Sequence, residues 1–145
     1  MHRAAVSGCL LHPDDVLVTT ACHEALTLAL RTLAEPGDVV AVDSPSFYGT
    51  MQALRAQKVQ VVEIPTDPQT GISLEALELA LEQWPIRVIH VAPTCNNPLG
   101  YTMPDKRKQE LVRLAQRFDV AIVEDDVYGD LAYDCLLYTS PSPRD

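Results

Sequence analysis

The residues most able to do chemistry lie where an apolar run ends in a group of carboxylates. Residues 121–123 are apolar, and Glu124, Asp125 and Asp126 follow them, with Tyr128 close behind. Residues just past the carboxyl end of a buried parallel strand face the crevice in which α/β folds bind ligands. Three adjacent carboxylates repel one another unless a cation lies among them. A bound cationic group explains this stretch, and a solvated acidic turn is the alternative.

Three other loops carry polar or aromatic residues after an expected strand. Residues 19–23, Thr-Thr-Ala-Cys-His, lead into a helix whose free N–H groups and dipole suit a phosphate. The next loop offers Phe47 or Tyr48 as a ring that can stack on a flat heterocycle. A third loop offers Asn97, whose amide can donate to a phenolic oxygen. Because the carboxyl ends of strands in a doubly wound sheet can lie on one edge, these loops can share one ligand.

A phosphate cradle, a stacking ring, an amide donor and a carboxylate together describe a pocket for pyridoxal 5'-phosphate. In such a pocket the Asp125 carboxylate could hold a proton on the pyridine nitrogen, and Tyr128 could supply a second hydrogen bond to the phenolate. A protonated pyridine accepts electrons from a substrate carbanion, which is the role that this cofactor brings to an enzyme. The sequence therefore predicts pyridoxal 5'-phosphate as the cofactor.

Length, composition and charge narrow the class of protein. The 145 residues are 47% hydrophobic and 21% charged, which predicts one globular unit with one core. The net charge of -9 argues against a nucleic-acid-binding surface on this segment, because phosphate contacts need clustered Lys and Arg. No apolar run approaches the ~20 residues of a membrane helix, and the start lacks the apolar core of a signal peptide. A cytoplasmic protein without a membrane partner is expected.

The cysteines indicate neither a metal site nor a disulfide framework. They are widely spaced, without a CxxC pair or a histidine at zinc-ligand spacing, at Cys9, Cys22, Cys95 and Cys135. Each is interpreted as a small buried hydrophobe or a loop thiol rather than a nucleophile. We therefore expect no metal.

Strands alternate with helices along the chain, which predicts an α/β fold with a mainly parallel sheet and helices on both faces. Apolar runs predict strands at 16–19, 39–42, 59–64, 87–91 and from 121 onward, with a polar turn at 65–71. Helical spacing of apolar residues predicts helices at 22–34, about 50–57, 73–84 and from 105 through 118. Thr19 or Thr20 is expected to cap the first helix, and Ser73 is expected to be a weak cap of the third.

Residues 135–145 differ from the rest of the chain, because they have no hydrophobic period and contain a Ser/Pro run. We interpret them as a translated cloning or sequencing-adaptor scar, with a genuine disordered tail as the alternative. The predicted cofactor-binding domain therefore comprises residues 1–134, and its globular part ends near Tyr133.

Four other residues that could do chemistry receive structural interpretations. His90 ends an expected strand and is interpreted as a packed core histidine rather than a base. His2 and His12 are expected in solvent near the start of the chain. Trp84 precedes Pro85 and is expected to anchor a helix end rather than to stack on a cofactor.

From about residue 10 to residue 134 the chain resembles the large, cofactor-binding domain of fold-type I pyridoxal-phosphate enzymes of the class I/II aminotransferase family. The motifs that carry the resemblance occur in the family's order, at 36–38, 44–49, 67–72, 96–100 and 124–128. Within the family the chain most resembles the aminotransferase-like domain of GntR/MocR-type transcription regulators, notably through residues 45–49, 97–100 and 103–105. The resemblance implies a truncated large domain of this α/β fold.

The resemblance implies a role for each matching position in the first three loops. Cys22 and His23 take the places of the phosphate-loop residues, with Ala21 where the family usually has glycine and His23 where it often has glutamine. Phe47 takes the place of the stacking aromatic residue. Asn97 takes the place of the asparagine that faces the ring hydroxyl.

In the last loop, Asp125 takes the place of the pyridinium partner and Tyr128 that of its companion donor. Asp125 is preferred over Asp126 because of the three-residue interval to Tyr128, and Asp126 is expected to point to the opposite side. The predicted cofactor-binding set is therefore Ala21, Cys22, His23, Phe47, Asn97, Asp125 and Tyr128.

The chain departs from the family in what it lacks. Transamination needs a lysine that forms a Schiff base and then acts as a general base. Lys58 follows an expected helix, Lys106 and Lys108 begin an expected surface helix, and none has the Ser-rich context of the family's Schiff-base lysine. The resemblance places that lysine and two ligand-binding arginines beyond residue 134. We therefore expect this chain to assemble half a cofactor site without catalytic turnover.

Three interpretations of the function remain open. In the first, the intact protein is an aminotransferase that moves an amino group between an amino acid and a 2-oxo acid. In the second, the domain senses an effector within a GntR/MocR-type transcription regulator that has a winged helix-turn-helix domain upstream. In the third, the loops are ordinary turns of a Rossmann-like sheet, and the ordered motifs match by coincidence. The resemblance also implies a homodimer when the protein is intact.

Overall fold

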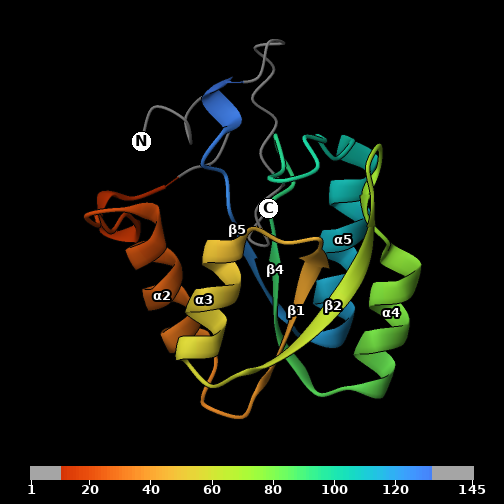
Figure 1. The fold of residues 1–145 in the computed structure, drawn as a ribbon, viewed down its shortest axis with the longest axis horizontal. Helices are drawn as coiled ribbons and strands as arrows, with labels where there is room; N and C mark the ends of the chain where they lie inside the picture. The colour runs from red at the N-terminus through yellow and green to blue at the C-terminus, as the bar shows by residue number, and fades with distance from the viewer. Residues whose placement is uncertain (1–10, 132–145) are drawn as a thin grey trace.

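A five-stranded sheet forms the centre of the computed structural model, which describes residues 11–131 (Figure 1). Its strand order is β3-β2-β1-β4-β5. The strands are β1 (Val39–Ser44), β2 (Gln60–Asp67), β3 (Gly71–Ile72), β4 (Ile86–Val91) and β5 (Ala121–Glu124). β1, β2, β4 and β5 are parallel, and β3 runs antiparallel to β2. The predicted α/β fold with a mainly parallel sheet is therefore confirmed.

Helices cover both faces of the sheet, as predicted. The described residues form four α-helices: α2 (Cys22–Leu33), α3 (Tyr48–Ala56), α4 (Leu74–Gln83) and α5 (Asp105–Phe118). α2 and α3 lie on one side of the sheet, and α4 and α5 lie on the other (Figure 1). Two short 3-10 turns, Pro13–Asp15 and Gly129–Leu131, lie near the ends of the described chain.

The central strand β1 is buried on both faces, which explains its uninterrupted apolar sequence. Val40 and Val42 belong to the core cluster under α2 and α3. Val39 and Ala41 belong to the larger cluster under α4 and α5. Successive side chains of a strand point to opposite faces, so one apolar run supplies two cores.

The amphipathic face of α5 includes a lysine that we expected at the surface. The predicted residues Leu111, Leu114 and Ala115 are buried, and Lys108 is buried with them at 2% exposure. Position 108 lies one helical turn before 111, so both side chains face the core. The Lys108 Nζ donates to Thr94 Oγ1 at 3.3 Å. The prediction of a surface position for Lys108 was therefore wrong.

The predicted strand at 16–19 is absent from the structure. Only a 3-10 turn precedes α2 among the described residues, and residues 16–19 after it pair with no strand there. Leu17 is 77% exposed and Val18 is 88% exposed. Strand propensity needs a partner strand to take effect, and the described part of the chain places none beside this segment.

The predicted polar turn at 65–71 is largely a hairpin. β2 continues to Asp67, and Thr66 pairs with Ile72 in an antiparallel ladder. Gly71 has φ +89°, and a Cβ there would lie 3.0 Å from the Tyr101 ring. Glycine at position 71 therefore permits both the positive φ and the close packing of the backbone against Tyr101 at the start of β3.

The remaining structural expectations concern side chains away from the sheet edge. His12 is exposed and caps the first 3-10 turn, and Trp84 is the C-cap residue of α4. Ser73 caps α4 by accepting from the Ala76 N–H at 3.2 Å. Cys22 and Cys95 are free thiols. His2, Cys9, Cys135, Tyr133 and the predicted tail at 135–145 lie outside the described residues.

None of the described helices combines the length and the apolar composition that crossing a membrane would require.

Candidate functional site

A pocket of about 170 Å³ opens at the carboxyl ends of β1, β4 and β5, beside the start of α2. The parallel strands end at the same edge of the sheet, so loops distant in sequence meet there. Six of the seven predicted cofactor-binding residues line the pocket: Cys22, His23, Phe47, Asn97, Asp125 and Tyr128. The seventh, Ala21, is the N-cap residue of α2 and is not part of the lining.

The start of α2 is capped differently from what we predicted. Neither Thr19 nor Thr20 accepts from the first turn, because the N-cap position is Ala21, which has no side-chain acceptor. Instead the Thr20 N–H and hydroxyl both donate to Glu24 Oε2 at 2.7 Å. These bonds lower the pKa of Glu24. The first turn of α2 thus has no side-chain cap from Ala21, whose backbone carbonyl accepts from the Glu24 N–H at 3.1 Å, and Cys22 at this end lines the pocket.

In the loop after β1, Phe47 rather than Tyr48 lines the pocket. Phe47 is the N-cap residue of α3 and is half exposed at 51%. A Cβ at position 49 would lie only 2.6 Å from Phe47 Cε1, so Gly49 leaves the space that the ring occupies. Tyr48 is 68% exposed, and its hydroxyl accepts from Gln52 at 3.0 Å.

The two adjacent asparagines of the loop after β4 face different environments. Asn97 lines the pocket, whereas Asn96 is 3% exposed. The Asn96 side chain accepts from the Leu99 N–H at 3.2 Å, and its backbone carbonyl accepts from the Gly100 N–H. Gly100 has φ +74°, a conformation that favours glycine. The buried asparagine therefore shapes the turn that carries the pocket asparagine.

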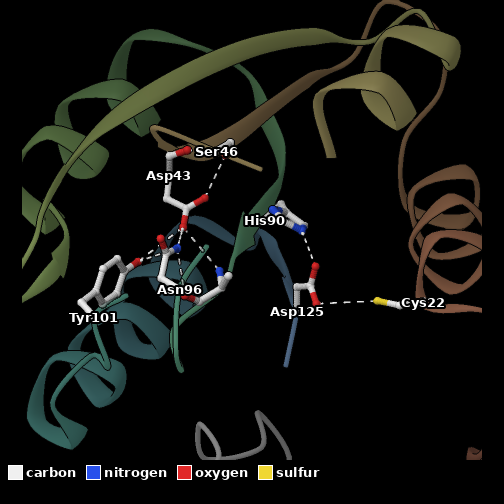
Figure 2. A network of polar contacts seen from close by, with 8 residues as sticks. Cys22, Asp43, Ser46, His90, Asn96, Tyr101 and Asp125 are labelled. Atoms are coloured by element: carbon white, nitrogen blue, oxygen red, sulfur yellow. Dashed lines mark hydrogen bonds and ion pairs between the residues drawn. The ribbon is translucent and has the colours of Figure 1, made fainter. Parts of the chain in front are cut away.

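Asp125 lies in the pocket at the end of β5. Its backbone N–H donates to the Val91 carbonyl at 2.9 Å, which ties it to β4. The Cys22 thiol lies 3.7 Å from Oδ1, and His90 Nε2 lies 4.0 Å from Oδ2 (Figure 2). Asp126 does not line the pocket. Partial burial and the nearby Asp125 carboxylate raise the pKa of the Cys22 thiol.

His90 is a pocket residue as well as a core residue. It is 2% exposed, as the sequence led us to expect, and its ring also lines the pocket. Neither Nδ1 nor Nε2 has a hydrogen-bond partner among the described residues. Burial lowers the pKa of His90, and the Asp43 and Asp125 carboxylates oppose that shift. The sequence signal was a single histidine among the apolar residues at 88–91, and only the fold showed that it reaches the pocket.

Asp43 was absent from the predicted site, although it also lines the pocket. It is 2% exposed at the end of β1, and its carboxylate accepts hydrogen bonds from several groups (Figure 2). The Asn96 Nδ2 donates at 2.8 Å and the Tyr101 hydroxyl at 3.3 Å. Burial, the Asp43 charge and this hydrogen bond raise the pKa of Tyr101, so the phenol stays protonated. The sequence signal for Asp43 was a carboxylate that directly follows the apolar run at 39–42.

None of the lysines among the described residues lines the pocket. Lys58 adopts φ 58° in the turn before β2, where its carbonyl accepts from the Gly37 N–H. That turn is at the amino end of the parallel strands, opposite the pocket. Lys106 is exposed on α5, and Lys108 is buried beside Thr94. The side chains that line the pocket within the described residues therefore supply carboxylates, two imidazoles, an amide, a thiol and aromatic rings, and no amine.

Proteins with similar sequences belong to a family that fits the sheet and the pocket described above. The sequence matches the family described as aminotransferase class I and II over residues 6–142. The uncharacterized HTH-type transcriptional regulator YjiR of Escherichia coli (strain K12) is 60% identical over 138 residues, which are 95% of this chain and 28% of that protein. Aromatic-amino-acid aminotransferase 1 of Thermococcus litoralis is 34% identical over 124 residues, which are 82% of this chain and 30% of that protein.

A solved structure shows the same fold. The crystal structure of Pyrococcus horikoshii kynurenine aminotransferase, in complex with PMP, is similar with a TM-score of 0.78 and 34% sequence identity. The similarity covers 84% of this chain and 31% of that one, so the chain spans less than a third of the length of these three proteins. The ordered motifs, the sheet and the family match lead to one conclusion: this chain belongs to the aminotransferase class I and II family.

Proposed function

We propose that the chain binds pyridoxal 5'-phosphate in the pocket at the carboxyl edge of the sheet. The observation that carries the proposal is the Asp125 carboxylate, which lines the pocket beside a buried His90 whose ring nitrogens have no hydrogen-bond partner among the described residues. Buried polar atoms without partners are rare in proteins and are often completed by a ligand or water. When bound, the cofactor supplies a ring that accepts electrons from a substrate.

The residues around Asp125 fit the pyridine side of such a ligand. A carboxylate in a partly buried site can hold a proton on a ring nitrogen through a charge-assisted hydrogen bond. We assign this role to Asp125 and leave Asp126 outside the site, since of these two neighbours Asp125 lines the pocket and Asp126 does not. Phe47 then stacks on the ring, while Asn97 and Tyr128 donate to its phenolic oxygen.

The start of α2 fits the phosphate group. A helix N-terminus presents free N–H groups and a positive dipole end, both of which favour an anion. Ala21 offers no side-chain oxygen that would compete for those N–H groups, and Cys22 and His23 line the pocket at this end. We assign Ala21, Cys22 and His23 to the phosphate loop. The Glu24 carboxylate, which would repel a phosphate, is held by two hydrogen bonds from Thr20.

The first experiment is a titration of the chain with pyridoxamine 5'-phosphate, followed by the fluorescence of the ligand. This amine form has no aldehyde, so it cannot react with surface lysines and reports the pocket alone. Asp125→Ala should weaken binding by about 10- to 100-fold, the range for a hydrogen bond to a charged group. Asp126→Ala, the matched control, should change the dissociation constant by less than about twofold. Equal effects of the two substitutions would remove the assignment of Asp125.

For the intact protein we propose an aminotransferase-like function that concerns an amino acid or a 2-oxo acid, in a homodimer. The family match and the similarity to aminotransferases of Thermococcus and Pyrococcus support this proposal. Because no lysine lines the pocket within the described residues, we propose that residues 1–145 alone do not catalyse transamination. An assay of this chain with pyridoxal 5'-phosphate, an amino acid and a 2-oxo acid should show no product above the rate without protein.

A second candidate function is favoured by one observation. The relative that is 60% identical, YjiR, is described as an HTH-type transcriptional regulator. In this alternative the domain belongs to a GntR/MocR-type regulator and senses an effector through the same pocket. Sequencing the gene on both sides of this segment separates the two candidates. An upstream winged helix-turn-helix domain would establish the regulator, whereas a frame without it that continues to a serine-flanked lysine would favour the enzyme.

A further inference from the structure

We propose that Asp43 is a positioning residue that holds the two loops carrying Phe47 and Asn97 around the pocket. The inference rests on the proposed function, because Phe47 and Asn97 are ligand contacts of the proposed cofactor site. Asp43 is the fifth residue of β1 and is 2% exposed, yet its side chain is acidic. Burial of a carboxylate is unfavourable unless hydrogen bonds compensate it. The residues that donate hydrogen bonds to this carboxylate therefore show which loops it positions.

One carboxylate oxygen holds the loop after β1. Ser46 Oγ lies 3.0 Å from Asp43 Oδ1, and the same hydroxyl lies close to the Asp43 backbone carbonyl. Ser46 immediately precedes Phe47, which begins α3 as its N-cap residue. Fixing Ser46 therefore restricts the backbone from which the Phe47 ring enters the pocket.

The other carboxylate oxygen holds the loop after β4. Asp43 Oδ2 accepts from Asn96 Nδ2 at 2.8 Å, from the Tyr101 hydroxyl at 3.3 Å and from the Ala92 N–H at 3.5 Å. The loop thus contacts one oxygen at its start, its middle and its end (Figure 2). Asn96 immediately precedes Asn97. A single carboxylate therefore fixes the residue before each of the two proposed ligand contacts.

The contacts of Oδ2 require an acceptor at position 43, and a carboxylate is the strongest one. An amide N–H, a hydroxyl and a backbone N–H all donate, and an ionised carboxylate only accepts. Asparagine has nearly the same shape but no charge, and its NH₂ group can be satisfied only on the side of Ser46, whose hydroxyl can also accept. Asp43→Asn is therefore a substitution that preserves volume and removes the charge that strengthens the bonds to the loop after β4.

The test measures pyridoxamine 5'-phosphate binding for Asp43→Asn, Asn97→Ala and the double variant. We expect Asp43→Asn to raise the dissociation constant about tenfold or more, by analogy with residues that orient the ligands of a metal. If Asp43 acts through Asn97, the double variant should bind better than the product of the two single effects predicts. If the double variant changes the dissociation constant by the product of the two single changes, to within about twofold, the two residues act independently and the inference is overturned.

Two controls keep the outcome decisive. Asp67→Asn makes the same change in a carboxylate that also accepts from its neighbours, Gln69 and Thr70, outside the pocket, and it should leave binding unchanged. If Asp43→Asn does not fold, the milder Ser46→Ala is combined with Phe47→Ala in the same kind of cycle. Independent effects in that cycle would also overturn the inference.

The inference can fail separately from the proposed function. If the wild-type chain does not bind pyridoxamine 5'-phosphate, the proposed function fails, and hydrogen exchange then tests the role of Asp43 without a ligand. Asp43→Asn should accelerate exchange of the Leu99 and Gly100 amides, which donate to Asn96. Unchanged exchange at both amides would mean that Asp43 does not hold this loop.

Discussion

Two carboxylates line the same pocket, and their surroundings differ in kind. Asp43 is surrounded by donors from Ser46, Ala92, Asn96 and Tyr101, a group that we call the Asp43 cluster. Asp125 has looser neighbours in Cys22 and His90, at 3.7 and 4.0 Å, and these three residues form the Asp125 cluster (Figure 2).

The difference separates a scaffold from a site that is ready for a ligand. A buried carboxylate with donors on both oxygens is satisfied by the protein itself, and such networks make a structure rigid. In the Asp125 cluster, the buried His90 nitrogens lack hydrogen-bond partners among the described residues, and the contacts of the carboxylate with Cys22 and His90 are long. The first cluster should therefore govern stability, and should affect ligand binding only through the loops that it positions, whereas the second should contact the ligand directly.

The largest expected effect is the loss of stability when Asp43 is removed. Asp43→Ala should lower the free energy of unfolding by about 3 kcal/mol or more, because several buried donors lose their acceptor. Asp125→Ala should change it by less than about 1 kcal/mol, since its contacts are long and partly exposed. Urea unfolding of both variants without ligand measures the difference, and equal losses would remove the distinction between the clusters.

His90 should make the stability of the wild-type protein depend on pH. Burial lowers its pKa below the 6.5 of the unfolded chain, although the Asp43 and Asp125 carboxylates act in the opposite direction. As the pH falls below 6.5, the unfolded state takes up a proton that the folded state binds less well. Stability should therefore fall, by up to about 1.4 kcal/mol per pH unit from this group.

The matched variant for this prediction is His90→Leu, which removes the imidazole and fills similar space. Between pH 7 and pH 5 it should lose less stability than the wild type in urea unfolding. At pH 7 it should be at least as stable, because two buried nitrogens without partners are gone. Parallel pH profiles for the two proteins would show that His90 does not titrate in this way.

A smaller effect is expected from a helix cap that belongs to neither cluster. Ser73→Ala removes the oxygen that accepts from the Ala76 N–H and should cost about 1 kcal/mol of stability. Its affinity for pyridoxamine 5'-phosphate should stay unchanged. This variant shows whether a loss of stability alone weakens binding. A weaker affinity would mean that stability and binding cannot be assigned to separate clusters.

The smallest expected effect concerns the Cys22 thiol. Burial and the Asp125 carboxylate raise its pKa, so Asp125→Asn should lower that pKa and raise the rate of alkylation at pH 8 by roughly threefold. Peptide mapping after treatment with iodoacetamide measures the rate, with Cys95 as the internal reference thiol. A rate that is unchanged relative to Cys95 would show that the carboxylate and the thiol are not coupled.

Local sequence patterns predicted much of the fold and most of the pocket. The apolar run at 39–42 predicted a strand, and the structure buries β1 on both faces. The apolar residues of α5 recur at helical spacing, which predicted a helix. The predicted loops meet because parallel strands end on one edge. Six of the seven predicted site residues consequently lie in one pocket, although their contacts with a cofactor stay predictions.

The failures share a physical cause, which is that neighbours in space decided them. Residues 16–19 have strand propensity but no partner strand within the described chain. The cap of α2 shifted to Ala21 because Thr20 bonds Glu24 instead. Lys108 is buried because the start of α5 packs against the loop that contains Thr94.

By itself the sequence determined the alternation of strands and helices and the order of the polar loops, because hydrophobic period and turn chemistry act over a few residues. Only the tertiary structure decided that Asp43 is held by a loop some fifty residues away, as its bond to Asn96 shows, and that His90 borders a pocket. Burial and hydrogen-bond partners depend on packing between distant segments, and that packing turns one carboxylate into a scaffold while it leaves another open to a ligand.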